Sequence, residues 1–508
     1  MTSMIDWATD RARMILVFVV MSLVAGILAY TSLPKEGEPD IDIPALFVSV
    51  PFPGISAEDS EKLIVKPLEN KLKGITGLKT MSSTAAEGYG GVALEFEFGW
   101  DKTATIANVR DKANQAQAEF PDGADQYSIN EINFSRFPIL VVSMSGQLPE
   151  RTMARVAKNL QDRIEAMPEV LEVGLAGQRN EMLEVLIDPL KLEAYNVTAG
   201  ELINVVTNNN LLIAAGEIEN DSGAFAIKIP SSFSKPKDVY NLPVKVNGNR
   251  VITLQDLADI RLTFEDRIGT ARFNGETTVT LQIIKRKGVN LISTVSLVKA
   301  EVEKITLEWE PELRDAITIN YSSDQSRQVS GMVSQLEGSV LTAIALVMIV
   351  VLASLGIRSA LLVGFAIPTS FLLAFALMGI SGITISNMVM FGLILAVGML
   401  VDGAIVVVEY ADKRISEGVE PMEAYGSAAK RMFWPIVSST ATTLCAFLPM
   451  LFWPGIPGEF MKMLPITLIY VLSASLLVAL IYLPVVGGVA GRLTRTLEKV
   501  SEYLRNNT

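Results

Sequence analysis

The sequence predicts a membrane protein in which a bundle of six spanning helices carries a large α+β region built from two split-βαβ (ferredoxin-like) units with an inserted subdomain. Two observations predict this class. Apolar runs long enough to cross a bilayer occur once near the start of the 508-residue chain and repeatedly in its second half. Between the first two runs lies a polar stretch of about 300 residues in which one order of strands and helices occurs twice.

The apolar runs define the spans. Because no Asp, Glu, Lys or Arg occurs between Arg358 and Asp402, and one membrane helix needs about 20 apolar residues, two helices fit there. The glycines of Gly379–Gly382 favour a turn between them. No small-x-small cleavage site follows the first run, which is therefore expected to be retained as a signal anchor. The other four runs are Met14–Thr31, Leu336–Ile357, Met432–Pro454 and Met463–Ala490.

Basic residues near the span ends predict the orientation, because Lys and Arg concentrate on the cytoplasmic side. The opposite short loops carry little more than Lys462. Both termini are therefore expected in the cytoplasm, with residues 34–333 outside and a cytoplasmic tail over 491–508 that is expected to form a short amphipathic helix. The basic residues on the cytoplasmic side are Arg11, Arg13, Arg358, Lys413, Arg414, Lys430, Arg431, Arg492, Arg495, Lys499 and Arg505.

Composition excludes several function classes. The formal net charge is −12, which argues against nucleic-acid binding because a phosphate-binding surface needs a basic patch. The chain contains no histidine, so imidazole metal sites are excluded. The single cysteine, Cys445, lies in the fifth span and gives no disulfide.

The outer region repeats one element order. The first copy reads as a strand (45–54), a helix that begins at Ser56 with Asp59 in a capping box, a glycine-rich hairpin (78–99) and a second helix (103–120). The second copy begins with a strand and a helix, and its hairpin is predicted from VLEVGLAG (170–177) and MLEVLID (182–188). The remaining elements of the second copy are expected at 139–146, 151–167, 278–288 and 290–305.

An insertion over about 189–268 interrupts the second copy. It reads as helical segments followed by a β-rich portion, and an insertion of this length is a subdomain of its own. Docking to something outside the chain and a merely decorative lobe are both compatible with it.

Asp402 is the most informative residue. It stands well inside the fourth span, where a charge costs about 2.5–3.5 kcal/mol on insertion scales. Such a residue lines a hydrated or protein-lined cavity, shuttles a proton, binds a cation, or makes a structural hydrogen bond. Glu409 lies on the same helical face nearer the cytoplasm. It reads equally well as a carboxylate at the interface and as part of the proton path.

The fifth span offers a cluster of hydroxyl groups that could satisfy Asp402 or line a hydrated path, although back-bonding to helix carbonyls explains any one of them equally well. The hydroxyl residues are Ser438, Ser439, Thr440, Thr442 and Thr443. No Lys or Arg lies deep in any of the predicted spans. The partner charge for Asp402 must therefore come from another polypeptide, or Asp402 stays protonated at rest.

Several motifs resemble those of one transporter family. They are VDGAIVVVEY from Val401 to Tyr410, PFPGISAEDSEKLIVKPLENKL from Pro51, GITGLKTMSSTAAEG from Gly74 and AAGEIE from Ala214. With these motifs the chain resembles, over nearly its whole length, the amino-terminal half of an RND (resistance-nodulation-cell division) permease of the AcrB type.

The resemblance implies a trimeric secondary exporter of the bacterial inner membrane that is driven by the proton motive force, has no other cofactor, and is not an enzyme. It implies small amphiphilic substrates, a periplasmic adaptor, an outer-membrane channel, and a second six-span half with a buried lysine facing Asp402. On this pattern the parts are a first span (1–33), a porter subdomain (34–133), a second porter subdomain (134–179 and 269–333), a docking subdomain (180–268), spans two to six (334–490) and the tail (491–508).

Three departures from the family pattern leave questions open. Gly403 replaces a second aspartate, so the proton count is open. Phe134, Phe137 and Tyr321 are candidates for substrate binding, but Ala176 stands where a phenylalanine is frequent, so the substrate class is open. The sequence ends after six spans, which fits a split gene, a truncated chain or a half that pairs with itself.

Other functions compete with drug export. The heavy-metal branch also has a single aspartate, and methionines at 388, 390 and 399 lie in the fourth span, although methionine filling a helix surface is far commoner. A non-transporting receptor or assembly relative is the second class. An enzyme is the weakest reading, because the sequence shows no nucleophile–base pair, phosphate-binding glycine loop or metal-ligand cluster.

Overall fold

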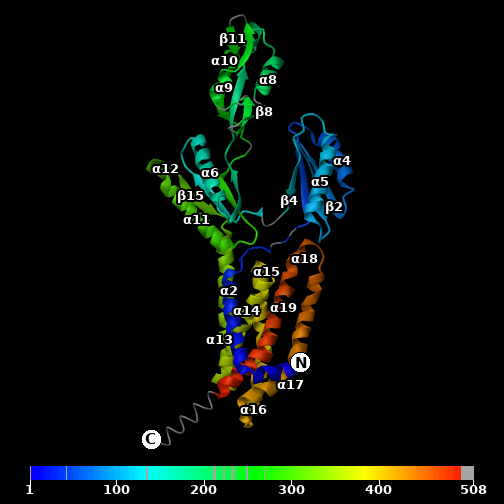
Figure 1. Cartoon of the computed structure of the whole chain (residues 1–508), viewed down its shortest axis with the longest axis vertical. Helices are drawn as coiled ribbons and strands as arrows, with labels where there is room; N and C mark the ends of the chain where they lie inside the picture. Colours follow the sequence, from blue (N-terminus) through cyan, green and yellow to red (C-terminus); the bar gives the residue numbers. More distant parts are fainter. Residues whose placement is uncertain are drawn as a thin grey trace.

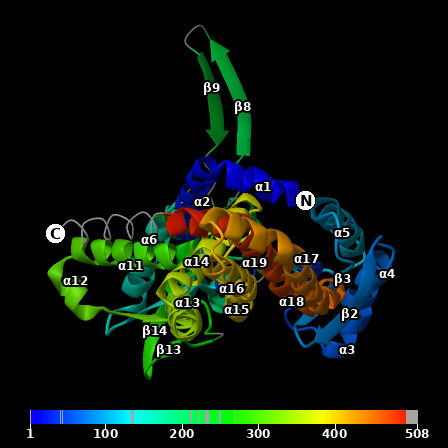
Figure 2. The ribbon, with the colours of Figure 1, turned by 90° about the horizontal axis from the view of Figure 1, so that it is seen from below.

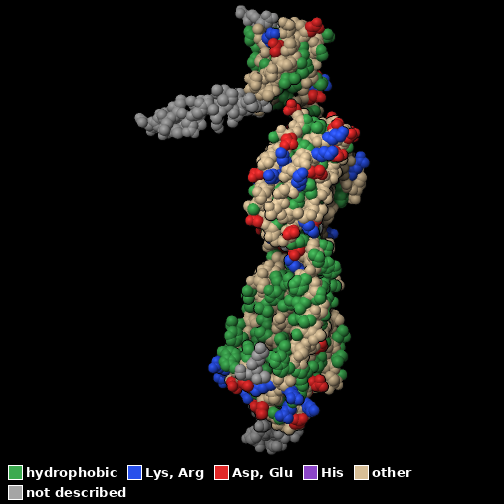
Figure 3. All heavy atoms as spheres, turned by 90° about the vertical axis from the view of Figure 1, so that its right-hand side faces the viewer, with side chains coloured by type: hydrophobic (Ala, Val, Ile, Leu, Met, Phe, Trp, Pro, Cys, Tyr) green, Lys and Arg blue, Asp and Glu red, His purple; other side chains and the backbone are tan. Residues whose placement is uncertain are grey.

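The computed structural model is an elongated molecule with the helical bundle at one end, two α/β units above it, and the insertion at the far tip (Figure 1). On the face seen in Figure 3 the bundle is mostly hydrophobic, and charged side chains gather below it and over the outer units. Phe134 and the tail after residue 492 lie outside the described residues. The structure describes residues 2–39, 41, 43–132, 136–209, 213–220, 223–229, 233, 235–247, 250–267 and 269–492.

Among the residues that the structure describes, six helices are long and apolar enough to cross a membrane, in agreement with the predicted number of spans. A short helix, α1 (Thr2–Asp10), precedes the first. The helix of the third span ends at Ile380, so the turn between the third and fourth spans lies within the predicted Gly379–Gly382 segment. Gly382 has a φ of 69° there. The spans are built from α2 (Ala12–Ser32), α13 (Gln325–Leu355), α14 (Ile357–Ile380), α15 (Asn387–Met399) with α16 (Val401–Ser416), α17 (Pro421–Phe447) with a 3-10 turn (Leu448–Phe452), and α18 (Gly455–Met461) with α19 (Met463–Leu477) and a π-helical segment (Val478–Tyr482) that continues to residue 492.

Close contact between the first and third spans depends on glycine. A Cβ added at Gly26 of α2 would lie 2.3 Å from the carbonyl oxygen of Leu372 in α14. Without a side chain, the two helix backbones can approach each other closely, as small residues allow in membrane bundles. This contact packs the first span against α14, one of the two most buried spans of the described bundle.

The first outer unit is a four-stranded antiparallel sheet in the order β2-β3-β1-β4. Alternate residues of β1, Leu46, Val48 and Val50, are fully buried against the helices, as the period of two in a strand requires. Ser56 caps the first helix by accepting a hydrogen bond from the Asp59 amide at 3.1 Å. The elements are β1 (Ala45–Pro51), α3 (Ala57–Ser60) with a π-helical turn (Glu61–Val65) and α4 (Lys66–Leu72), β2 (Leu78–Ala86), β3 (Tyr89–Phe96), α5 (Lys102–Gln117) and β4 (Ser128–Glu131).

The second outer unit has the same order of strands and helices. Its strand β14 pairs with β5 on one side and with β6 on the other, and β15 pairs with the far edge of β5. Both units are therefore mixed α/β structures on an antiparallel sheet. The elements are β5 (Leu140–Ser145), α6 (Glu150–Glu165), β6 (Val170–Ala176), β13 (Arg272–Phe273), β14 (Glu276–Lys285), α11 (Leu291–Glu308), α12 (Pro311–Ala316) and β15 (Thr318–Ser322).

One pairing in the second copy was predicted wrongly. The strand after β6, β7 (Glu181–Ile187), does not form a hairpin with it, and pairs along its whole length with β12 (Ala258–Phe264). The chain thus leaves the second sheet on β7 and returns on β12. The place expected for β7 is taken by β14, which arrives in the sheet after the insertion.

The β7–β12 ladder leads to the inserted lobe. A small hydrophobic core forms there around Leu202, Ile252 and Leu257. A hairpin of β8 (Ile213–Asn220) and β9 (Gly223–Ile229) projects from the body of the molecule (Figure 2). The other elements of the lobe are α7 (Pro189–Ala194), α8 (Ala199–Asn208), α9 (Pro236–Tyr240), β10 (Pro243–Asn247), β11 (Arg250–Thr253) and α10 (Leu254–Leu257).

Candidate functional site

The fourth span is two helices that meet at Leu400, and Asp402 lies in the first turn of the second one, α16. From the sixth span, the Ser475 hydroxyl donates a hydrogen bond of 2.9 Å to the Leu400 carbonyl oxygen. Sequence reasoning treated the span as one helix and missed both the junction and Ser475. Gly398 and Gly403 on either side of Leu400 are the signal that could have indicated it.

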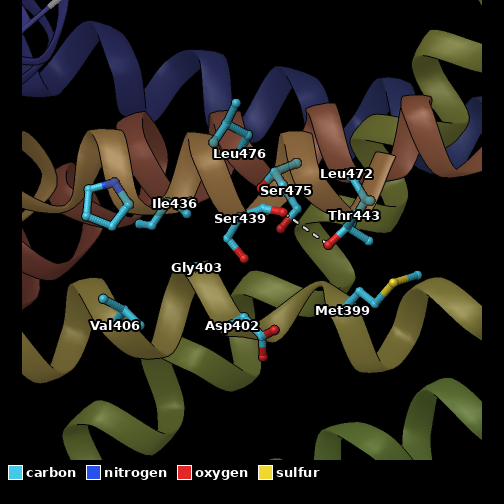
Figure 4. Close-up of a pocket in the computed structure, with 13 residues that line it drawn as sticks. Met399, Asp402, Gly403, Val406, Ile436, Ser439, Thr443, Leu472, Ser475 and Leu476 are labelled. Carbon is cyan, nitrogen blue, oxygen red and sulfur yellow. Dashed lines mark hydrogen bonds between the residues drawn. The ribbon is translucent and has the colours of Figure 1, made fainter. Parts of the chain in front are cut away.

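Asp402 lines a cavity of about 130 Å³ between α16, α17 and α19. Figure 4 shows the Ser439 hydroxyl pointing from α17 toward the part of α16 that holds Asp402 and Gly403. The wall of this cavity mixes hydroxyl groups with apolar side chains. Its lining residues are Met399, Asp402, Gly403, Val406, Pro435, Ile436, Ser439, Thr440, Thr443, Leu472, Ser475, Leu476 and Ala479.

The Asp402 side chain is exposed. In Figure 4 its carboxylate points away from α17. Among the residues that the structure describes, no hydrogen-bond or ion-pair partner reaches this carboxylate. The bundle as it stands therefore supplies one wall of the site and leaves the acid itself uncovered.

The predicted hydroxyl cluster divides into two groups. Ser439, Thr440 and Thr443 line the cavity beside Asp402, whereas Ser438 and Thr442 do not. Three of the five donate to carbonyls of their own helix: Ser438 to Trp434 at 2.7 Å, Thr442 to Ser438 at 2.8 Å, and Thr443 to Ser439 at 3.1 Å. Back-bonding thus occupies the protons of these three hydroxyls.

Glu409 lines a different cavity, of about 550 Å³, toward the carboxy-terminal end of α16. This cavity is also lined by Asp412 and Lys413, and by Leu355 at the end of α13. Val406 lines both cavities, so the cavity beside Asp402 and the cavity beside Glu409 are neighbours along α16.

Gly403 is packed where the second aspartate of the family pattern would stand. A Cβ added there would lie 3.1 Å from Ile436 Cγ2 and 3.5 Å from Ala479 Cβ. A carboxylate at this position would have to displace the Ile436 side chain of α17. The position next to Asp402 is thus closely packed against Ile436.

The two described aromatic candidates for substrate binding, Phe137 and Tyr321, are not brought together. Phe137 is 56% exposed and lines a cavity of about 130 Å³ with Glu36 and Lys285. Tyr321 lines a separate cavity between α11 and β15, where the Lys299 ammonium lies 5.2 Å from the centre of its ring. Burial raises the pKa of the Tyr321 hydroxyl, with a further contribution from the charge of Glu303.

The methionines of the fourth span do not surround one point. Met390 is buried in the bundle core, whereas Met399 lines the Asp402 cavity. In the described part of the chain, no group of three or more Cys, Asp or Glu side chains is placed to hold a metal ion.

The motifs and the fold can be compared with known proteins. A family model described as the AcrB/AcrD/AcrF family matches residues 4–502. The chain is 29% identical over 496 residues to the multidrug resistance protein MdtF of Escherichia coli K12, with 95% of this chain and 47% of MdtF covered. It is 27% identical over 489 residues to the toluene efflux pump membrane transporter TtgE of Pseudomonas putida, with 94% and 46% covered.

The multidrug resistance protein MdtC of an Enterobacter species is 26% identical over 486 residues, with 93% of this chain and 46% of MdtC covered. The chain therefore spans about half the length of the curated relatives that it matches. Since the family model covers nearly the whole chain, the protein belongs to the AcrB/AcrD/AcrF family of RND transporters.

Proposed function

We propose that this chain is the amino-terminal half of a proton-driven secondary exporter of hydrophobic or amphiphilic compounds in the inner membrane. The observation that carries the proposal is Asp402, an acid inside a membrane span that lines a partly polar cavity. An intramembrane carboxylate is expensive to insert and generally marks an ion or proton pathway. The relatives' names, which include multidrug resistance proteins and a toluene efflux pump, support export of apolar compounds.

In this proposal Asp402 takes up and releases the transported proton. Ser439, Thr440 and Thr443 line the hydrated route to it, and Glu409 serves the cytoplasmic end. The exposed carboxylate has to be covered before it can change its protonation in a low-dielectric site. A second six-span half, with a buried lysine, would provide both the cover and the switchable positive charge.

The outer units fit the roles of porter subdomains. We assign residues 34–133 to one and 134–179 with 269–333 to the other, each a split-βαβ fold by its order of strands and helices. The lobe at 180–268, with its projecting hairpin, is assigned to docking between subunits of a trimer that works with a periplasmic adaptor and an outer-membrane channel. Spans at 1–33 and 334–490 complete the chain, with a cytoplasmic tail at 491–508.

Replacing Asp402 with Asn tests the proposal. Asn keeps the size of the side chain but cannot ionise, so efflux of a hydrophobic dye from cells carrying the complete transporter should be abolished at unchanged membrane level. Glu417→Gln is the matched control, because Glu417 is an exposed carboxylate that ends the same helix. Efflux retained by the Asp402→Asn variant would contradict the proposal and favour a non-transporting role.

A further inference from the structure

A buried ion pair joins the membrane bundle to the second outer unit. Glu36, in the segment that follows the first span, and Lys285, the last residue of β14, are 2.9 Å apart. Their side chains are only 5% and 9% exposed. Charges are rarely buried this fully unless they are paired, because each loses its hydration. This pair is therefore held in one geometry by its surroundings, unlike a surface ion pair.

The Glu36 segment is bonded to the start of the fourth span. The Glu36 amide donates to the Ile385 carbonyl at 3.0 Å, and the Ile385 amide donates to the Pro34 carbonyl at 2.9 Å. The Asn387 amide, at the first residue of α15, donates to the Gly37 carbonyl at 3.1 Å. These bonds make a short parallel bridge between the two segments. A displacement of α15 along its axis must therefore move Glu36.

The opposite side of this segment contacts the second outer unit. The Leu291 amide, at the first residue of α11, donates to the Lys35 carbonyl at 3.2 Å. Lys285 ends a strand that lies between β5 and β6 in its sheet. A force on the Lys285 ammonium is thus applied to the sheet through a central strand rather than through a loop.

Asp402 lies in the same span. From Asn387 the fourth span runs as α15 to Met399, and Asp402 follows two residues after the Leu400 junction, in the first turn of α16. The charge of this acid and the position of the Glu36 segment are therefore linked through the start of α16, helix α15 and three backbone hydrogen bonds. Helices transmit such displacements because their packing is tight and resists compression.

We infer that Glu36 and Lys285 are positioning residues for transport, which pass movement of the Asp402-bearing span to the second outer unit. The inference rests on the proposed function. The pair supplies the side-chain part of the link, and the hydrogen bonds to Ile385 and Leu291 hold the segment in register. Removing both charges should leave the fold intact. The sheet of the second outer unit should then follow the movement of the fourth span less closely.

Transport measurements compare three changes in the complete transporter. Glu36→Gln combined with Lys285→Met removes both charges without leaving one buried and unpaired, and should lower efflux by about tenfold at unchanged membrane level. Glu36→Lys combined with Lys285→Glu exchanges the partners, and should recover most of the efflux. Glu58→Gln with Lys62→Met is the matched control, because that pair is exposed on the first outer unit.

A distance measurement separates this inference from the proposed function. Cys445→Ala first removes the single native cysteine of the chain. Spin labels are then placed at exposed positions on two helices, Gln115→Cys in α5 and Lys158→Cys in α6. With the pair intact, Asp402→Asn should shift the distance between the labels. In the Glu36→Gln/Lys285→Met background that shift should disappear.

The outcomes are distinct. A shift of the same size without the ion pair overturns the inference, and so does the absence of a shift when the pair is intact. A failed charge exchange, with the protein folded and the neutral variant fully active, also overturns it. Loss of efflux in Asp402→Asn supports the proposed function whatever the labels report, because that measurement does not depend on the pair.

Discussion

Gly403 and Glu150 show how single residues control charge in the two halves of the molecule. In the span, a Cβ added at Gly403 would lie 3.1 Å from Ile436, so a larger side chain there has to displace that neighbour. In the outer region, Glu150 at the start of α6 accepts hydrogen bonds from Arg179 Nε at 2.9 Å and Nη2 at 2.6 Å, and lies 3.7 Å from Arg267. Packing at Gly403 disfavours a charged side chain, whereas hydrogen bonds at Glu150 stabilise one.

Gly403→Asp should reduce the amount of folded protein. The new side chain must push Ile436 aside, and overpacking of this kind costs about 1–3 kcal/mol. Adding Ile436→Val should restore part of the loss, because it removes a methyl group near the contact. Melting of the purified protein in detergent measures both effects. Equal melting of Gly403→Asp and wild type would show that the packing at this position yields easily.

Glu150 should make the outer region sensitive to acid. The hydrogen bonds from Arg179 outweigh burial and hold the pKa of Glu150 below its usual range. The ionised form therefore stabilises the fold above the unfolded pKa of about 4.3, and this contribution is lost as the pH falls through the lower folded value. Wild type should melt above Glu150→Gln at pH 7, and the gap should close on acidification.

The matched control for this measurement is Glu58→Gln, whose carboxylate pairs with Lys62 on an exposed surface. Exposed pairs of this kind contribute little to stability. Its melting should therefore stay near that of wild type at every pH. A gap between Glu150→Gln and wild type that widens as the pH falls would contradict the assigned sign.

At the scale of elements, the fourth and sixth spans are joined where the fourth is interrupted. The hydroxyl of Ser475 reaches the carbonyl of Leu400, two residues before Asp402. A hydrogen bond in a membrane bundle is worth about 0.6 kcal/mol on average, so its importance lies in position more than in stability. It joins the sixth span to the junction of α15 and α16, beside the acid.

Ser475→Ala should impair transport more than it impairs folding. The Leu400 carbonyl loses this donor, and the junction gains freedom next to Asp402. Efflux by the complete transporter and the melting midpoint are measured together, with Ser473→Ala as the control because Ser473 is exposed on the same helix. Equal efflux for the two alanine variants would show that the contact does not position the acid.

A helix or strand can be predicted from the sequence when a local property of the chain determines it. The spans were predictable because charge-free apolar runs are long enough to admit no other structure. The β7 pairing was not, since the short segment from Gly177 to Asn180 looks like a hairpin turn. Long-range contacts determine this pairing. Asn180 donates a hydrogen bond to Glu265 at 3.0 Å and Arg179 binds Glu150, and these two contacts direct β7 toward β12.

The site was predictable in part for the same reason. Asp402 stands out in any reading because a charge in an apolar run is costly. Which hydroxyls face it could not be derived from composition, because a rotation of α17 by one residue changes the set. The division between Ser439, Thr440 and Thr443 on one side and Ser438 and Thr442 on the other comes from helix packing.

At the scale of the whole molecule, two outer units stand above the bundle and the insertion extends beyond them (Figure 1). The second unit is tied to the spans through the Glu36 segment and through Asp324, which caps α13 and receives Lys299 at 2.5 Å. Burial disfavours the ionised form of Asp324. Hydrogen bonds from Lys299 and Ser326 outweigh this effect and keep the pKa of the Asp324 carboxyl below its usual range. Helix α13 therefore continues from the outer unit into the membrane as one body.

The orientation of the molecule can be measured directly. With Cys445→Ala as background, Ser83→Cys on the first outer unit should react with a membrane-impermeant maleimide added to spheroplasts. Glu417→Cys, at the end of α16, should react only after the membrane is opened. This outcome follows from the excess of Lys and Arg at the α16 end of the bundle. The reverse labelling pattern would place the outer units in the cytoplasm.

The uncovered carboxylate of Asp402 has a consequence for how the cell handles the chain. A bundle that presents an acid and the Ser439 hydroxyl at its outer wall is poorly solvated by lipid tails, and newly inserted copies would be natural targets for membrane proteases. The half-life of the chain should then rise and fall with the supply of whatever covers that wall. Pulse-chase labelling with and without the complementary half would show synthesis of the two kept in proportion by degradation of the excess.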